Sequence, residues 1–96
     1  MRPSVALELH RAAIRAIVTA HRACNPRVFG SVLSGNDAEG SDLDLLIDTT
    51  PETSLFDLNA IGNAIEGLLG VPVDVLTPNG LPPKFREAVL AEAKPV

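Results

Sequence analysis

The stretch SDLDLLID, from Ser41 to Asp48, places acidic residues at alternate positions of an otherwise apolar strand. Side chains leave a strand on alternate faces. One face would therefore carry Leu43, Leu45 and Ile47, and the other Asp42, Asp44, Leu46 and Asp48. Asp is depleted in strands, and an unpaired carboxylate in apolar surroundings is costly or shifts its pKa. We therefore expect a functional interaction to compensate for these carboxylates.

Periodic apolar residues and turn signals predict the other elements. Helices are expected over about 4–23, 54–69 and 83–93, a helical turn in SVLSG (31–35), and strands over 27–29, 42–48 and 71–76. Ser4 is expected to cap the first helix, Ser54 and Asp57 have capping-box spacing, and Gly70 would end the second helix. Three short strands flanked by helices predict an α+β fold, a two-layer α/β sandwich, in a single domain over residues 1–96. The order of the strands and the relative direction of the first two stay open.

Composition narrows the functional classes. The net charge of −4, with no Trp or Tyr and three Phe, argues against direct nucleic-acid binding, which needs clustered cations and stacking rings. No apolar run approaches the roughly 20 residues that cross a bilayer, and the charged N-terminal segment is a poor signal peptide. The single cysteine, Cys24, cannot form an internal disulfide, which favours a cytoplasmic location. A small anionic ligand stays possible if a metal ion supplies the opposing charge.

Three aspartates suggest where that metal would bind. Asp42 and Asp44 lie two residues apart, so both carboxylates leave one face of their strand, as oxygen ligands of hard divalent cations would. Asp74 also lies in the middle of an apolar strand. If the two strands are neighbours, three carboxylates converge, and their mutual repulsion would raise their pKa values unless Mg²⁺ neutralises them.

A Gly-Ser pair ends the first expected strand. Gly30 would let the backbone approach a ligand closely, and free N–H groups before a helical turn favour a phosphate. Ser31 adds a hydroxyl donor. Hydrogen-bond donors to a phosphate, placed opposite metal-binding carboxylates, are what metal-assisted phosphoryl or nucleotidyl transfer requires.

These motifs resemble a known superfamily. Gly30-Ser31, ten intervening residues and then Asp42-Leu43-Asp44, with VDVLT as a third acidic strand, are similar to the signature of the polymerase-β-like nucleotidyltransferases, and the chain resembles their minimal nucleotidyltransferase branch. The resemblance implies a small mixed sheet flanked by helices. It also implies that Asp42, Asp44 and Asp74 bind two Mg²⁺ ions, that Gly30 and Ser31 hold the nucleotide phosphates, and that Asp74 helps to deprotonate or orient the nucleophile.

The resemblance implies a partner as well. Family members of this size are commonly antitoxins of HEPN-type ribonuclease toxins, and some transfer AMP from ATP to a toxin tyrosine. Two alternatives stay open: a non-catalytic antitoxin that neutralises its partner by complex formation, and nucleotidyl transfer to a small molecule. Asp42→Asn with Asp44→Asn would separate catalysis from binding alone.

One position departs from the family pattern. Where relatives often read GSxxRG this chain reads GSVLSG, so Ser34 replaces an arginine that could contact phosphate or acceptor. A serine supplies neither the charge nor the bidentate fork. The missing cation would come from Arg22, Arg27, Lys84 or a partner.

The site residues also have structural interpretations. Asp42 could cap a turn, Asp44 could be solvated, and Asp74 could be exposed on an edge strand. Ser31 could cap a helix, bind phosphate, or do both. Asp48, at the far end of its strand, is expected to be a turn residue.

The remaining polar residues suggest no site. His10 and His21 would lie about 16 Å apart along one helix, too far for one ion. Cys24 is expected to be a small hydrophobe. Asp37 and Glu39 are expected to be loop residues, in a loop that could fold over a nucleotide.

Overall fold

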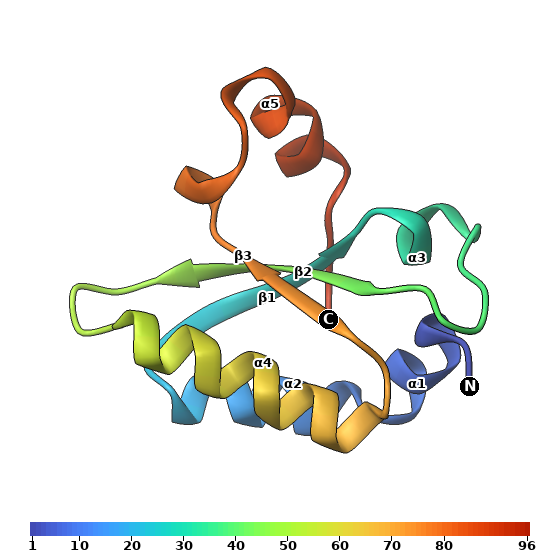
Figure 1. Ribbon diagram of the computed structural model, residues 1–96. Helices are drawn as coiled ribbons and strands as arrows, with labels where there is room; N and C mark the ends of the chain where they lie inside the picture. Colours follow the sequence, from blue (N-terminus) through green and yellow to red (C-terminus); the bar gives the residue numbers. More distant parts are fainter.

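A four-stranded mixed sheet in the order β3-β2-β1-β4 runs through the middle of the computed structural model, which describes residues 1–96 (Figure 1). The elements, in chain order, are α1 (Pro3–Leu9), α2 (Arg11–Ala20), β1 (Ala23–Phe29), α3 (Ser31–Ser34), β2 (Leu43–Thr49), α4 (Leu55–Leu69), β3 (Val73–Leu76), the 3₁₀ helix η1 (Pro78–Gly80), α5 (Pro83–Glu92) and β4 (Lys94–Pro95). None of the helices is both long enough and apolar enough to cross a membrane.

The strand pairings settle the order of the strands and the relative direction of the first two, which the sequence left open. β1 pairs antiparallel with β2, and Phe29 lies opposite Asp44. β2 pairs parallel with β3, and Asp44 lies opposite Asp74. The register of β1 shifts between Cys24 and Arg27, so the strand contains an irregularity near its start.

The expectation of three strands was wrong, because the chain ends in a fourth. β4 pairs antiparallel with β1 through Arg27–Pro95 and Val28–Lys94. Guanidinium groups of α2 hold this end in place: Arg11 donates to the Pro95 carbonyl and Arg15 to the Val96 carbonyl, 2.8 Å away. A two-residue strand has no periodicity of its own, so only these long-range bonds define it.

The two faces of the sheet are covered differently. In Figure 1, α1, α2 and α4 lie against one face, while α5 stands on the other. Leu43, Leu45 and Ile47 are buried in the core on the side of the three helices, as the alternation predicts. Leu46 faces the other way and is also fully buried, although it lies outside that core cluster. The acidic face is therefore only partly open to solvent.

The expected first helix is two helices. The chain breaks at His10, whose φ of −131° and ψ of 22° are not helical. Ser4 does not cap α1, because the helix begins at Pro3 and Ser4 lies in its first turn. Its backbone N–H donates instead to the Asp37 carboxylate, 2.9 Å away, which lies in the loop after α3. Asp37 is a loop residue as expected, but it is buried and also accepts from Arg2.

The α4–β3 unit follows local signals closely. Ser54 and Asp57 form the predicted capping box, and α4 ends at Leu69 with Gly70 left-handed at φ 71°. Pro72 precedes β3, which begins two residues later than expected and lies at the sheet edge. This unit places Asp74 beside β2.

Candidate functional site

Three aspartates lie on the same face of the sheet where β2 and β3 run side by side. Asp44 and Asp74 are direct register partners on parallel strands, so their side chains leave the same face of the sheet. Asp42 comes just before β2 and has the same parity as Asp44. Because Leu43 and Leu45 are buried against the helices, the carboxylates point to the opposite face.

The charges of these groups interact. Burial raises the pKa of Asp44, and the negative charges of Asp74 and then Asp42 raise it further. Asp44 is half-buried, whereas Asp42 and Asp74 are exposed. The ionised cluster is therefore unfavourable on its own and would be stabilised by a cation.

The donor set can be compared with the needs of a divalent ion. Carboxylate oxygens are the ligands that Mg²⁺ prefers. No three His, Cys, Asp or Glu side chains are already gathered at a point where one ion could be held. Asp42 and Asp74 are exposed, so packing does not fix their rotamers, and both can turn toward Asp44. The chemistry of the set fits Mg²⁺, and its arrangement needs side-chain movement to bind.

Gly30 lies directly against Asp44. Its φ is 76°, and a Cβ at this position would overlap the Asp44 carboxylate. Phe29, the preceding residue, is the register partner of Asp44 across β1 and β2. The Gly-Ser turn and the acidic cluster are therefore adjacent, as the motif spacing predicts.

Ser31 is the first residue of α3 and is half-buried. The N-cap position is occupied by Gly30, and no side chain caps the helix. The interpretation of Ser31 as the N-cap was therefore wrong. The Ser31 carbonyl accepts a hydrogen bond from the Ser34 hydroxyl, so the Ser34 side chain is engaged within its own turn.

Other charged residues are engaged elsewhere. Asp48 accepts hydrogen bonds from Arg27 and Asn25 at the far end of β2, so it is separate from the cluster. Arg22 pairs with Asp57 at 3.0 Å. Two cations suggested as substitutes for the family arginine, Arg22 and Arg27, are thus committed to other carboxylates.

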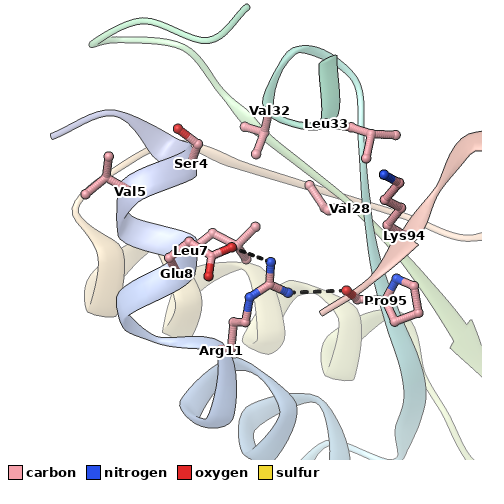
Figure 2. Close-up of a pocket in the computed structure, with 10 residues that line it drawn as sticks. All are labelled: Ser4, Val5, Leu7, Glu8, Arg11, Val28, Val32, Leu33, Lys94 and Pro95. Atoms are coloured by element: carbon pink, nitrogen blue, oxygen red, sulfur yellow. Dashed lines mark hydrogen bonds and ion pairs between the residues drawn. The ribbon is translucent and has the colours of Figure 1, made fainter. Parts of the chain in front are cut away.

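A separate pocket lies on the helical side of the sheet. Figure 2 shows this cavity of about 520 Å³ between α1 and the strands β1 and β4, with Val5, Leu7 and Val28 among its lining residues. Arg11 spans it, donating to Glu8 and to the Pro95 carbonyl. None of the three clustered aspartates lines it.

A second pocket adjoins the Gly-Ser turn and was missed from sequence. It has a volume of about 630 Å³ and is lined by Gly30, Leu33, Ser34, Ala91, Glu92 and Lys94. The end of α5 and β4 bring its last three residues to the turn across some 60 positions of sequence. No local pattern marks them, because this proximity depends on the fourth strand.

Comparison with known proteins identifies the family of this chain. Residues 26–96 match the family model of the nucleotidyltransferase domain. A "putative protein adenylyltransferase" of Methanocaldococcus jannaschii is 35% identical over 77 residues, covering 80% of this chain and 83% of that protein. Protein adenylyltransferase MntA of Thermococcus cleftensis is 35% identical over 65 residues, covering 68% of this chain and 66% of that protein.

Solved structures support the same assignment. A structure described as a "putative minimal nucleotidyltransferase" superimposes with a TM-score of 0.87 at 43% identity, covering 97% of this chain and 95% of that one. A toxin-antitoxin structure with AMP-PNP shares the fold at a TM-score of 0.73 and 15% identity, covering 88% of this chain and 69% of that one. The predicted fold is confirmed, and the chain belongs to the nucleotidyltransferase domain family as a minimal nucleotidyltransferase.

Proposed function

We propose that this chain is an Mg²⁺-dependent protein adenylyltransferase that transfers AMP from ATP to a HEPN-type toxin protein and so acts as its antitoxin. The observation that carries the proposal is the register of Asp44 with Asp74, with Gly30 packed against the same Asp44 carboxylate. Two relatives at 35% identity are named as protein adenylyltransferases, and a protein of the same fold is described in a toxin-antitoxin structure with AMP-PNP.

In the proposed site, Asp42, Asp44 and Asp74 would hold Mg²⁺. When bound, the metal supplies positive charge that stabilises the triphosphate and the transition state. Gly30 and Ser31 border the phosphates: the glycine permits close approach of the backbone, and the Ser31 hydroxyl is a donor. Asp44 lies deepest of the three carboxylates, so it anchors the set, while the exposed Asp42 and Asp74 adjust around it.

The transfer step balances without a further reactant. The oxygen of an acceptor hydroxyl on the partner forms a bond to the α-phosphorus of ATP, and the bond from that phosphorus to the bridging oxygen breaks. Pyrophosphate leaves with the electron pair. Asp74, exposed at the sheet edge where a protein acceptor can approach, receives or directs the hydroxyl proton.

The test uses the full chain, ATP, Mg²⁺ and, as acceptor, the protein product of the neighbouring reading frame. Intact-mass spectrometry is expected to show the toxin gaining one AMP with the wild type and none with Asp42→Asn combined with Asp44→Asn. Asp48→Asn is the matched control, because it removes a carboxylate from the same strand outside the cluster.

Two results would contradict the proposal. A toxin that binds the wild-type chain but stays unmodified would favour neutralisation by complex formation. Retention of neutralisation by the double variant would lead to the same conclusion, because that variant keeps the docking surfaces and loses only the carboxylates.

A further inference from the structure

Glu66, in the last turns of α4, binds the backbone of the strand that carries Asp74. Its carboxylate accepts a hydrogen bond from the backbone N–H of Val73, 2.9 Å away. Val73 is the first residue of β3 and immediately precedes Asp74. The Glu66 side chain is half-buried and forms no ion pair. The backbone of β3 is therefore the partner of this carboxylate.

The start of β3 depends on contacts from two sides. The strand has four residues and lies at the edge of the sheet, so β2 pairs with it on one side only. On that side, the Leu43 N–H donates to the Pro72 carbonyl, 2.8 Å away. On the free side, where an edge strand leaves its N–H groups without a partner strand, the Glu66 carboxylate accepts from Val73. The first residues of β3 are thus held by β2 and by α4 together.

This anchor acts on the acidic cluster through the backbone. The Asp74 side chain is exposed, so its place beside Asp44 depends on the strand that carries it. In Figure 1, α4 lies against the face of the sheet opposite α5, whereas the aspartates point to the α5 face. Glu66 is therefore no ligand of the cluster. Without its bond the start of a short edge strand would be held from one side, and such segments open first.

We propose that Glu66 is a positioning residue for Asp74: by holding the Val73 N–H, it keeps Asp74 in register with Asp44, where both carboxylates can share Mg²⁺. The inference rests on the proposed function and adds to it a residue outside the acidic face. A hydrogen bond from a backbone N–H to a carboxylate is charge-assisted and stronger than a neutral one. An amide oxygen can accept the same bond, so the role needs an acceptor at this position rather than a negative charge.

The first experiment measures transfer of AMP by the full chain, with ATP, Mg²⁺ and the protein product of the neighbouring reading frame as acceptor. Glu66→Ala is expected to lower kcat about 10- to 100-fold, the effect of displacing a reacting group by up to about 1 Å. The KM for ATP should change less than about threefold, because Asp42 and Asp44 remain in place. Glu66→Gln should retain most of the wild-type kcat, since it keeps the acceptor oxygen.

A double variant shows whether Glu66 acts through Asp74. In the Asp74→Asn background, Glu66→Ala should lower kcat little further, because the group that it positions is already lost. Equal factors in the two backgrounds would mean that Glu66 affects the reaction by another route, and the inference would be wrong.

Hydrogen exchange, followed by NMR without nucleotide or acceptor, tests the anchor independently of activity. In Glu66→Ala the backbone amide of Asp74 should exchange about tenfold faster, the effect of losing one hydrogen bond from the strand. The amide of Leu45, in the middle of β2, should keep its wild-type rate. Asn63→Ala is the matched control, because Asn63 lines the same groove between α4 and β3 but makes no hydrogen bond to the strand. It should change neither the exchange rates nor kcat.

The outcomes separate this inference from the proposed function. If Glu66→Ala keeps the wild-type kcat or the wild-type exchange rate at Asp74, Glu66 does not position Asp74, and the adenylyltransferase proposal is unaffected. If the wild type transfers no AMP, the proposed function fails, and the exchange rates still decide whether Glu66 holds the strand. Alanine is the best helix former, so the substitution should leave α4 intact, and circular dichroism checks this.

Discussion

Gly30 lies so close to the carboxylate of Asp44 that no other residue type fits at position 30 without displacing it. The Gly-Ser turn and the acidic strand are neighbours in the sheet, through the pairing of Phe29 with Asp44. The two halves of the motif are separated by ten residues in the sequence but form one packed unit, so they can be tested together.

Gly30→Ala is expected to abolish AMP transfer and to destabilise the fold. The alanine would have to keep the left-handed φ of position 30, and its Cβ would overlap the Asp44 carboxylate. Gly35→Ala is the matched control, because Gly35 has a φ of 78° but a Cβ at this position would meet no atom within 4 Å. Gly35→Ala should lose about 1 kcal/mol of unfolding free energy in urea, from backbone strain alone. If Gly30→Ala retains the activity of Gly35→Ala, the close approach has no functional role.

The pH dependence of stability should report the raised pKa of Asp44. The folded protein holds this proton to higher pH than the unfolded chain, so the free energy of unfolding falls as pH rises from about 4 through the folded pKa. In EDTA at neutral pH, Asp44→Asn should therefore raise Tm by about 1–3 °C, a small gain because solvent screens a half-exposed group. The difference between the two proteins should vanish below pH 4, where both states are protonated.

Mg²⁺ should reverse the order of the two Tm values, so that the wild type becomes more stable than Asp44→Asn. A cation bound by the three carboxylates stabilises the folded wild type by mass action and has less to bind in Asp44→Asn. Thermal unfolding is measured first in EDTA and then at increasing Mg²⁺ concentrations. The added Mg²⁺ should raise the Tm of the wild type more than that of the variant. Equal responses of the two proteins would argue against a metal site at this cluster.

Asp37 should matter for stability rather than catalysis. Hydrogen bonds from Ser4, the backbone N–H first, and the charge of Arg2 lower its pKa despite the opposing effect of burial. Asp37→Ala removes the acceptor at the start of α1 and should lower Tm by roughly 5 °C, the effect of losing a helix cap in a domain of this size. Glu39→Ala, in the exposed part of the same loop, should change Tm little. The contribution of Asp37 should be lost as pH falls through its lowered pKa.

The sequence predicts elements whose signals are local. Ser54, Asp57 and Gly70 mark both ends of α4 within the helix itself, and strict alternation identifies β2 and its acidic face. Interactions between distant segments were not predictable. Ser4 and Asp37 are 33 positions apart, and the role of Asp37 in holding α1 appears only once the loop folds back. Lys94 pairs with Val28 through a two-residue strand that has no pattern to detect.

Asp74→Asn should separate chemistry from binding. Asp74 lies opposite Asp44 at the exposed edge of the sheet, where an acceptor hydroxyl can approach. Loss of a group that receives or directs the acceptor proton should lower kcat about 10²–10⁴-fold. The KM for ATP should change much less, because Asp42 and Asp44 remain. Single-turnover transfer to the toxin protein, followed by mass spectrometry, measures this split, with Asp48→Asn as the control at the far end of the neighbouring strand.

An Asp74→Asn variant that transfers AMP at the wild-type rate would show that another group handles the proton, because asparagine can orient a hydroxyl but cannot accept its proton at neutral pH.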